Sequence, residues 1–75
     1  MTEIEQQVLQ TLLELEKSAQ AMATANPKPD LLPIFTRLDE LTQQLPGATD
    51  AMLLHYLHRK SYQKARVFLQ ESAAR

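Results

Sequence analysis

The stretch that decides the fold runs from Asp50 to Ser72 and reads DAMLLHYLHRKSYQKARVFLQES. On a helical projection at about 100° per residue, one narrow stripe of it is mostly apolar. That stripe contains Leu54, Leu57, Ser61, Ala65, Phe68 and Ser72. The opposite side, beside Arg59 and Arg66, contains Met52, Tyr56, Gln63 and Val67. A helix that only covered a core would have one apolar face and a charged back. We therefore predict a helix over residues 50–72 that offers contacts on two sides.

The size of the chain limits the core that it can build. It has 75 residues and no cysteine. Such a length forms one domain at most, and its core supplies only roughly 3–5 kcal/mol without a disulfide. We expect a single small helical domain over residues 1–75, stabilised by ordered helix packing or by a partner chain.

Localisation follows from what the sequence lacks. The N-terminal residues MTEIEQQ carry acids where a secretory signal would carry Lys or Arg, and the longest apolar run is Ala51–Leu54. A membrane span needs roughly 20 apolar residues, and a chain without cysteine fits a reducing compartment. The expectation is a cytoplasmic protein that makes no use of a membrane.

Charge is distributed unevenly along the chain. Residues 1–48 hold seven Asp/Glu and three Lys/Arg, whereas residues 49–75 hold two and five, for a net charge of −1. This asymmetry indicates either an anion-binding surface or attraction between two parts of one fold. Both interpretations stay open.

The N-terminal residues predict a long helix. Thr2 and Glu5 have the spacing of a capping box, and the apolar residues that follow lie within an arc of about 80°. They are Ile4, Val8, Leu12, Leu15, Ala19 and Met22. No Gly or Pro precedes Pro27, so this helix is expected to run from about residue 2 to about residue 25.

The prolines predict a second helix. Pro27 and Pro29 break the first one, Asp30 is typical of an N-cap, and Pro33 is tolerated in a first turn. Apolar residues then recur every three or four positions up to Leu45, before Pro46-Gly47. Thr49 or Asp50 would cap the third helix.

Together these ranges predict an all-α fold, a three-helix up-down-up bundle with helices at about 2–25, 31–45 and 50–72. The first and third helices would be parallel neighbours. Phe68 and Leu69 are then expected near Ala19, Met22 and Phe35. Leu53 and Leu54 are expected near Ile4, Val8 and Leu45. The middle helix is too short to cover both longer ones, so we expect the protein to dimerise through the apolar surface left over.

A break inside the last helix is the alternative, with a turn at Arg59-Lys60-Ser61 and a new helix starting from Ser61. The spacing of Tyr56, Ala65 and Leu69 then resembles part of a tetratricopeptide repeat. That family has Trp and Gly where this chain has Thr49 and Leu53, and the sequence holds no second copy at the repeat's period. The chain is therefore not assigned to the family.

Two groups of residues predict a contact surface. The first is Met52, Tyr56, Arg59, Gln63 and Val67. The second is Leu9 and Leu13. Interfaces favour aromatic, Met and Arg side chains. Single apolar residues on a surface need no explanation, but these are spaced to adjoin, which favours an interface.

Other kinds of site have weaker support. His55 and His58 share a helix flank, yet a metal site needs further ligands that no motif supplies. Arg59, Lys60, Lys64 and Arg66 are interleaved with tyrosines, as on a nucleic-acid-binding helix. They do not form one stripe, however, and a pI near 6.0 is low for a dedicated binder.

Catalysis has almost no support, because the chain has no cysteine nucleophile and a single glycine. We expect no catalytic, cofactor-binding or metal site. The expected function is a non-enzymatic protein–protein interaction module, an adaptor or accessory subunit whose third helix contacts a protein partner or a second copy. The alternative is a nucleic-acid-associated protein that uses the basic third helix.

Overall fold

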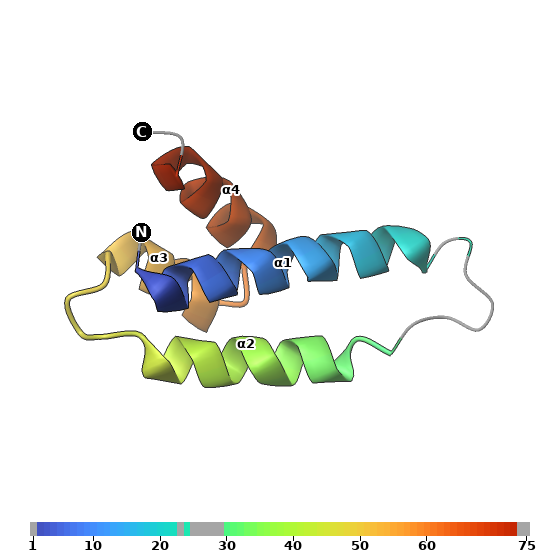
Figure 1. Ribbon diagram of the computed structural model, residues 1–75, viewed down its shortest axis with the longest axis horizontal. Helices are drawn as coiled ribbons and strands as arrows, with labels where there is room; N and C mark the ends of the chain where they lie inside the picture. Colours follow the sequence, from blue (N-terminus) through green and yellow to red (C-terminus); the bar gives the residue numbers. More distant parts are fainter. Residues whose placement is uncertain (1, 23, 25–29, 74–75) are drawn as a thin grey trace.

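The computed structural model of the chain describes residues 2–22, 24 and 30–73. These residues form four helices, α1 (Glu3–Ala21), α2 (Leu32–Gln44), α3 (Ala51–His58) and α4 (Tyr62–Ala73) (Figure 1). The predicted all-α class is confirmed, whereas the predicted count of three helices is wrong. Within the described ranges, no helix combines the length and the apolar character needed to cross a bilayer.

Helix α1 begins as its sequence predicts. The Thr2 hydroxyl accepts a hydrogen bond from the Glu5 backbone N–H at 3.2 Å, and the Glu5 carboxylate accepts one from the Thr2 N–H at 3.3 Å. This reciprocal pair is the capping box, which satisfies backbone donors that the helix itself leaves unpaired. The helix continues to Ala21 with Met22 as its C-cap. The predicted end near Ala25 lies outside the described residues.

Helix α2 begins close to its predicted start. The Asp30 carboxylate accepts a hydrogen bond from the Leu32 N–H at 3.0 Å. Leu31, rather than Asp30, holds the N-cap position, and its carbonyl accepts from the Phe35 N–H at 3.1 Å. Pro33 lies in the first turn, where its missing N–H costs nothing. After Gln44 the backbone becomes extended at Leu45.

Helix α3 begins at Asp50, one of the two predicted caps, whose carboxylate accepts from the Met52 N–H at 2.8 Å. It ends far earlier than residue 72. Lys60 has a positive φ of 58°, the Ser61 N–H donates to the Tyr56 carbonyl at 2.8 Å, and the Lys60 N–H donates to the Leu57 carbonyl at 3.1 Å. These two bonds define a Schellman motif, which closes a helix with a left-handed residue.

The chain then starts α4 at once. The Ser61 carbonyl accepts from the Ala65 N–H at 3.0 Å, and the helix runs from Tyr62 to Ala73. The alternative of a turn at Arg59–Ser61 is therefore the arrangement found, and the prediction of one helix over 50–72 is wrong. The reason is local: a left-handed turn usually carries Gly, and here it carries Lys.

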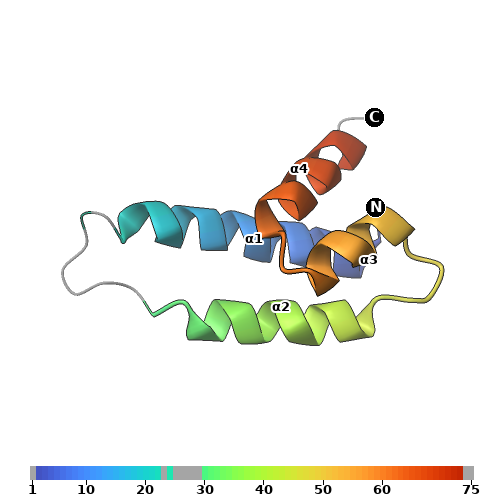
Figure 2. The same ribbon diagram turned by 180° about the vertical axis from the view of Figure 1, so that it is seen from behind.

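This turn changes the topology of the whole molecule. Helices α1 and α2 lie antiparallel, and the chain folds back at the end of α3 so that α4 crosses α1 (Figure 1). The view from behind shows α3 and α4 as a hairpin on the α1–α2 pair (Figure 2). Helix α3 packs on α4 and less extensively on α2, so the predicted parallel contact of the first and third helices is wrong.

Aromatic side chains show the consequence for packing. Tyr62, at the start of α4, stacks on Phe35 with ring centroids 5.8 Å apart and an interplanar angle of 23°. Phe68 instead meets Tyr56 edge to face at 6.4 Å and 68°. The expected placement of Phe68 beside Phe35 is therefore wrong, because α4 runs back from the centre of α1 rather than along it.

All four helices contribute to one buried cluster. Its members are Val8, Leu12, Leu38, Leu41, Leu45, Leu53, Leu57, Ala65 and Leu69. Leu53, Val8 and Leu45 are all members of this cluster, although α3 packs on α4 and α2 rather than on α1. Thr11 is also buried, and its hydroxyl donates to the Gln7 carbonyl at 2.7 Å, so that its polar atom keeps a partner.

Candidate functional site

Three of the predicted contact residues meet in one place. Tyr56 of α3 and Gln63 and Val67 of α4 line a surface groove with a volume of about 540 Å³. Its other lining residues are Lys64, Phe68 and Glu71. We refer to these six residues as the α3–α4 groove. It exists because the turn at Lys60 brings α4 back beside α3.

The inner wall of the α3–α4 groove is aromatic. Tyr56 and Phe68 meet edge to face, and both pack partly against the buried cluster. Tyr56 also lies 5.9 Å from the His55 ring. Val67 stands beside them with 40% of its surface exposed. The groove therefore presents apolar surface whose shape is held by the core.

The remaining predicted contact residues are not gathered there. Met52 is 48% exposed and lies one turn before Tyr56 on α3, but it does not line the groove. Arg59 is exposed at the C-cap of α3. Leu9 packs against the core, and Leu13 is 39% exposed on α1. Of the second predicted patch, only Leu13 is therefore exposed.

Sequence reasoning missed Lys64, Phe68 and Glu71 as groove residues. Phe68 lies on the stripe that the sequence predicts to face the core, and in the structure it is half-buried and lines the groove as well. Positions 64, 67, 68 and 71 have the i, i+3, i+4, i+7 spacing of one helix face. That spacing was the available signal. Leu32 at the start of α2, which lies outside the groove, is a further exposed apolar residue that the sequence analysis did not single out, with 67% of its surface exposed.

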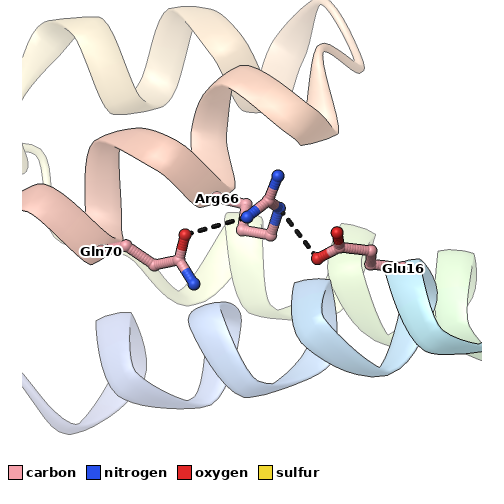
Figure 3. Close-up of polar contacts among 3 residues, drawn as sticks. All are labelled: Glu16, Arg66 and Gln70. Carbon is pink, nitrogen blue, oxygen red and sulfur yellow. Dashed lines mark hydrogen bonds and ion pairs between the residues drawn. The ribbon is translucent and has the colours of Figure 1, made fainter.

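A second groove lies between α1 and α4 and has a volume of about 380 Å³. Its lining residues are Leu12, Leu15, Glu16, Ala19, Gln20, Tyr62, Gln63 and Arg66. Arg66 forms an ion pair with Glu16, with 3.1 Å between Nε and Oε2, and donates to Gln70 at 2.9 Å (Figure 3). The guanidinium of Arg66 is thus held by neighbours within the same molecule.

This ion pair bears on the uneven charge distribution. Glu16 belongs to the acidic half of the chain and Arg66 to the basic half. Their contact joins α1 to α4, and the Arg66 side chain is only 18% exposed. Attraction within the fold therefore accounts for at least this part of the asymmetry.

Tyr62 is the one titratable group with a resolved change among the described residues. Burial of its ring raises the pKa of the phenol, and the carboxylate of Asp39 on α2 raises it further. Both effects disfavour the phenolate. Tyr62 consequently stays neutral near physiological pH and contributes packing against Phe35.

The two histidines lie in the last turn of α3. In the part of the chain that the structure describes, no three or more His, Cys, Asp or Glu side chains are grouped so that they could hold a metal ion. Both His55 and His58 are exposed. The histidine pair accordingly offers no defined coordination geometry.

Comparisons of the chain with models of protein families, with curated proteins and with solved structures gave no match. The resemblance to a tetratricopeptide repeat therefore rests on the spacing of Tyr56, Ala65 and Leu69 and on the turn between α3 and α4. Function has to be inferred from the two grooves and their side chains.

Proposed function

We propose that the protein is a small, cytoplasmic, non-enzymatic protein–protein interaction module and that the α3–α4 groove is its contact surface. The observation that carries the proposal is the edge-to-face pair of Tyr56 and Phe68 with Val67 exposed beside it. Aromatic side chains with an apolar neighbour and a polar rim are the composition of an interface core.

The shape and rigidity of the groove support this assignment. Its aromatic wall packs on the buried cluster, so a partner meets a surface that is already ordered and little conformational entropy is lost on binding. Gln63, Lys64 and Glu71 form a polar rim. An exposed groove between two helices is suited to receive an amphipathic helix of the partner.

Nucleic-acid binding, the alternative, is less well supported. Arg66 forms an ion pair with Glu16, and Glu71 adds a negative charge to the same groove that Lys64 lines. A phosphate backbone needs several cations on one face, and a nearby carboxylate opposes it. Of the exposed bases Arg59, Lys60 and Lys64, only Lys64 lines the groove, while Arg59 and Lys60 lie in the turn after α3, so the three do not form such a face.

Site-specific photo-crosslinking in the native host tests the proposal. With p-benzoylphenylalanine in place of Val67, we expect a covalent adduct to protein, because the side chain at this position lies in the groove. The same amino acid in place of Gln10, exposed on α1, is the matched control and is expected to give little adduct. Equal yields from both positions, or none from position 67, would count against the proposal.

A second variant checks that the aromatic wall matters. Tyr56→Ala removes one ring of the edge-to-face pair, so we expect it to lower the crosslinking yield from position 67. Far-ultraviolet circular dichroism should show unchanged helicity, because Tyr56 is only half-buried. An unchanged yield would mean that the ring does not contribute to the contact.

A further inference from the structure

The side of α4 that lines the α3–α4 groove carries a pattern of charges that is complementary to itself. Lys64, Val67, Phe68 and Glu71 have the i, i+3, i+4, i+7 spacing, so they form one stripe along the helix. Read along the chain, the stripe is basic, apolar, apolar and acidic. Lys64 precedes Val67 by three residues, and Glu71 follows Phe68 by three, so the charges lie symmetrically about an apolar centre.

In two antiparallel α4 helices, the charges and apolar residues of one stripe lie opposite complementary residues of the other. A two-fold axis between Val67 and Phe68 places Lys64 of each copy opposite Glu71 of the other and joins the apolar residues at the centre. Two-fold contacts of this kind are the commonest form of self-association. We propose that a second copy of this chain occupies the α3–α4 groove, with the two α4 helices antiparallel.

The charges of the stripe are available for this contact. Lys64 and Glu71 are both exposed, and neither forms an ion pair with another described residue. They are two helical turns apart on α4, at equal distances from the two-fold axis. Each therefore lies opposite the other's charge when two α4 helices pair antiparallel. Tyr56 lies against Phe68 on the α3 side and extends the apolar centre.

The groove between α1 and α4 lacks this property. Its charged groups, Glu16 and Arg66, already neutralise each other within one molecule. An arriving copy would have to break their contact before gaining a new one. On the groove-lining stripe of α4, by contrast, a second copy gains two ion pairs and breaks none.

This inference rests on the proposed function, since it names the partner of the same groove. Charge reversal combined with sedimentation equilibrium tests it. Lys64→Glu places Glu opposite Glu71, and Glu71→Lys places Lys opposite Lys64, twice in each dimer. We expect either variant to weaken dimerisation roughly 10- to 30-fold in Kd, because two surface attractions become two repulsions. The exposed Lys17→Glu on α1 is the matched control and should leave Kd unchanged.

Mixing the variants provides the decisive result. A Lys64→Glu copy has two acids on the stripe and a Glu71→Lys copy has two bases. In an equimolar mixture we therefore expect a mixed dimer with a lower Kd than the dimer that either variant forms with itself. The double variant, with both charges exchanged, should dimerise like the natural chain. Native mass spectrometry identifies the mixed species, and circular dichroism verifies that each variant is folded.

Three outcomes would overturn the self-contact. They are a natural chain that stays monomeric at all concentrations, a dimer that neither reversal weakens, and a mixture of the two variants that fails to associate. The proposed function fails separately, because it predicts a protein adduct from position 67 whatever the partner. An adduct to a different protein with a monomeric natural chain would reject the second copy and retain the interaction module.

Discussion

Lys60 is the residue that sets the direction of α4, and it does so in a conformation that L-residues disfavour. Its φ of 58° places it in the left-handed region, which costs roughly 1–2 kcal/mol for a side chain with a Cβ. We expect Lys60→Gly to raise the free energy of unfolding by about 1 kcal/mol, since glycine is the usual residue at this place in a Schellman motif. Urea unfolding followed by circular dichroism measures the change.

The matched control for that prediction is the same substitution in a right-handed helix. Lys17→Gly on the exposed face of α1 should lower the free energy of unfolding by about 0.5–1 kcal/mol. Opposite signs for the two variants would confirm that backbone conformation at Lys60 is the cause. A loss of stability in Lys60→Gly would contradict it.

Tyr62 predicts a dependence of stability on pH. Its phenol has a raised pKa in the folded chain and the ordinary value of 10.0 when unfolded. The unfolded state therefore loses the proton first, so that stability is complete below pH 10.0 and falls as the pH rises through the folded pKa. We expect Tyr62→Phe to flatten this fall, as measured by urea unfolding at a series of alkaline pH values. Identical slopes in the variant and the natural chain would contradict the assignment.

At the scale of elements, the starts of the helices could be predicted and the break between α3 and α4 could not. Thr2 with Glu5 and Asp50 are capping residues whose chemistry is local, and the structure places their hydrogen bonds as expected. The turn at Lys60 contains neither Gly nor Pro. Its residues are acceptable helix formers, so the helical spacing of apolar residues continues across the turn. The sequence therefore favours one continuous helix over the fold-back.

The same break divides the molecule into two pairs of helices. Helix α1 packs mainly on α2 and α3 packs mainly on α4, while α4 packs on α1 as extensively as on α3. Helix α4 joins the pairs through the buried Ala65 and Leu69 and through the Arg66–Glu16 ion pair. We expect native-state hydrogen exchange to show α3 and α4 opening together at a lower free energy than α1 and α2. Protection of α3 equal to that of α1 would show that the four helices open as one unit.

At the scale of the whole molecule, the candidate site could be predicted only in part. Tyr56, Gln63 and Val67 share one side of a continuous helix, and they still meet once the chain folds back. Leu9 was expected to remain uncovered because the pattern shows which face is apolar but not which helix will cover it. In the structure Leu9 packs on the core, and Leu13 is the member of the pair that stays exposed.

The turn at Lys60 also exposes this topology to exchange of segments between copies. If residues 59–61 became helical, α3 and α4 would form one straight rod, and Ala65 and Leu69 would leave the α1 of their own chain. Only the α1 of another copy could bury them again, which gives a domain-swapped dimer with the same core contacts. The left-handed conformation of Lys60 costs free energy only in the folded-back chain, which brings its free energy closer to that of the exchanged form. Lys60→Gly removes this cost and would therefore favour the folded-back chain over the exchanged form.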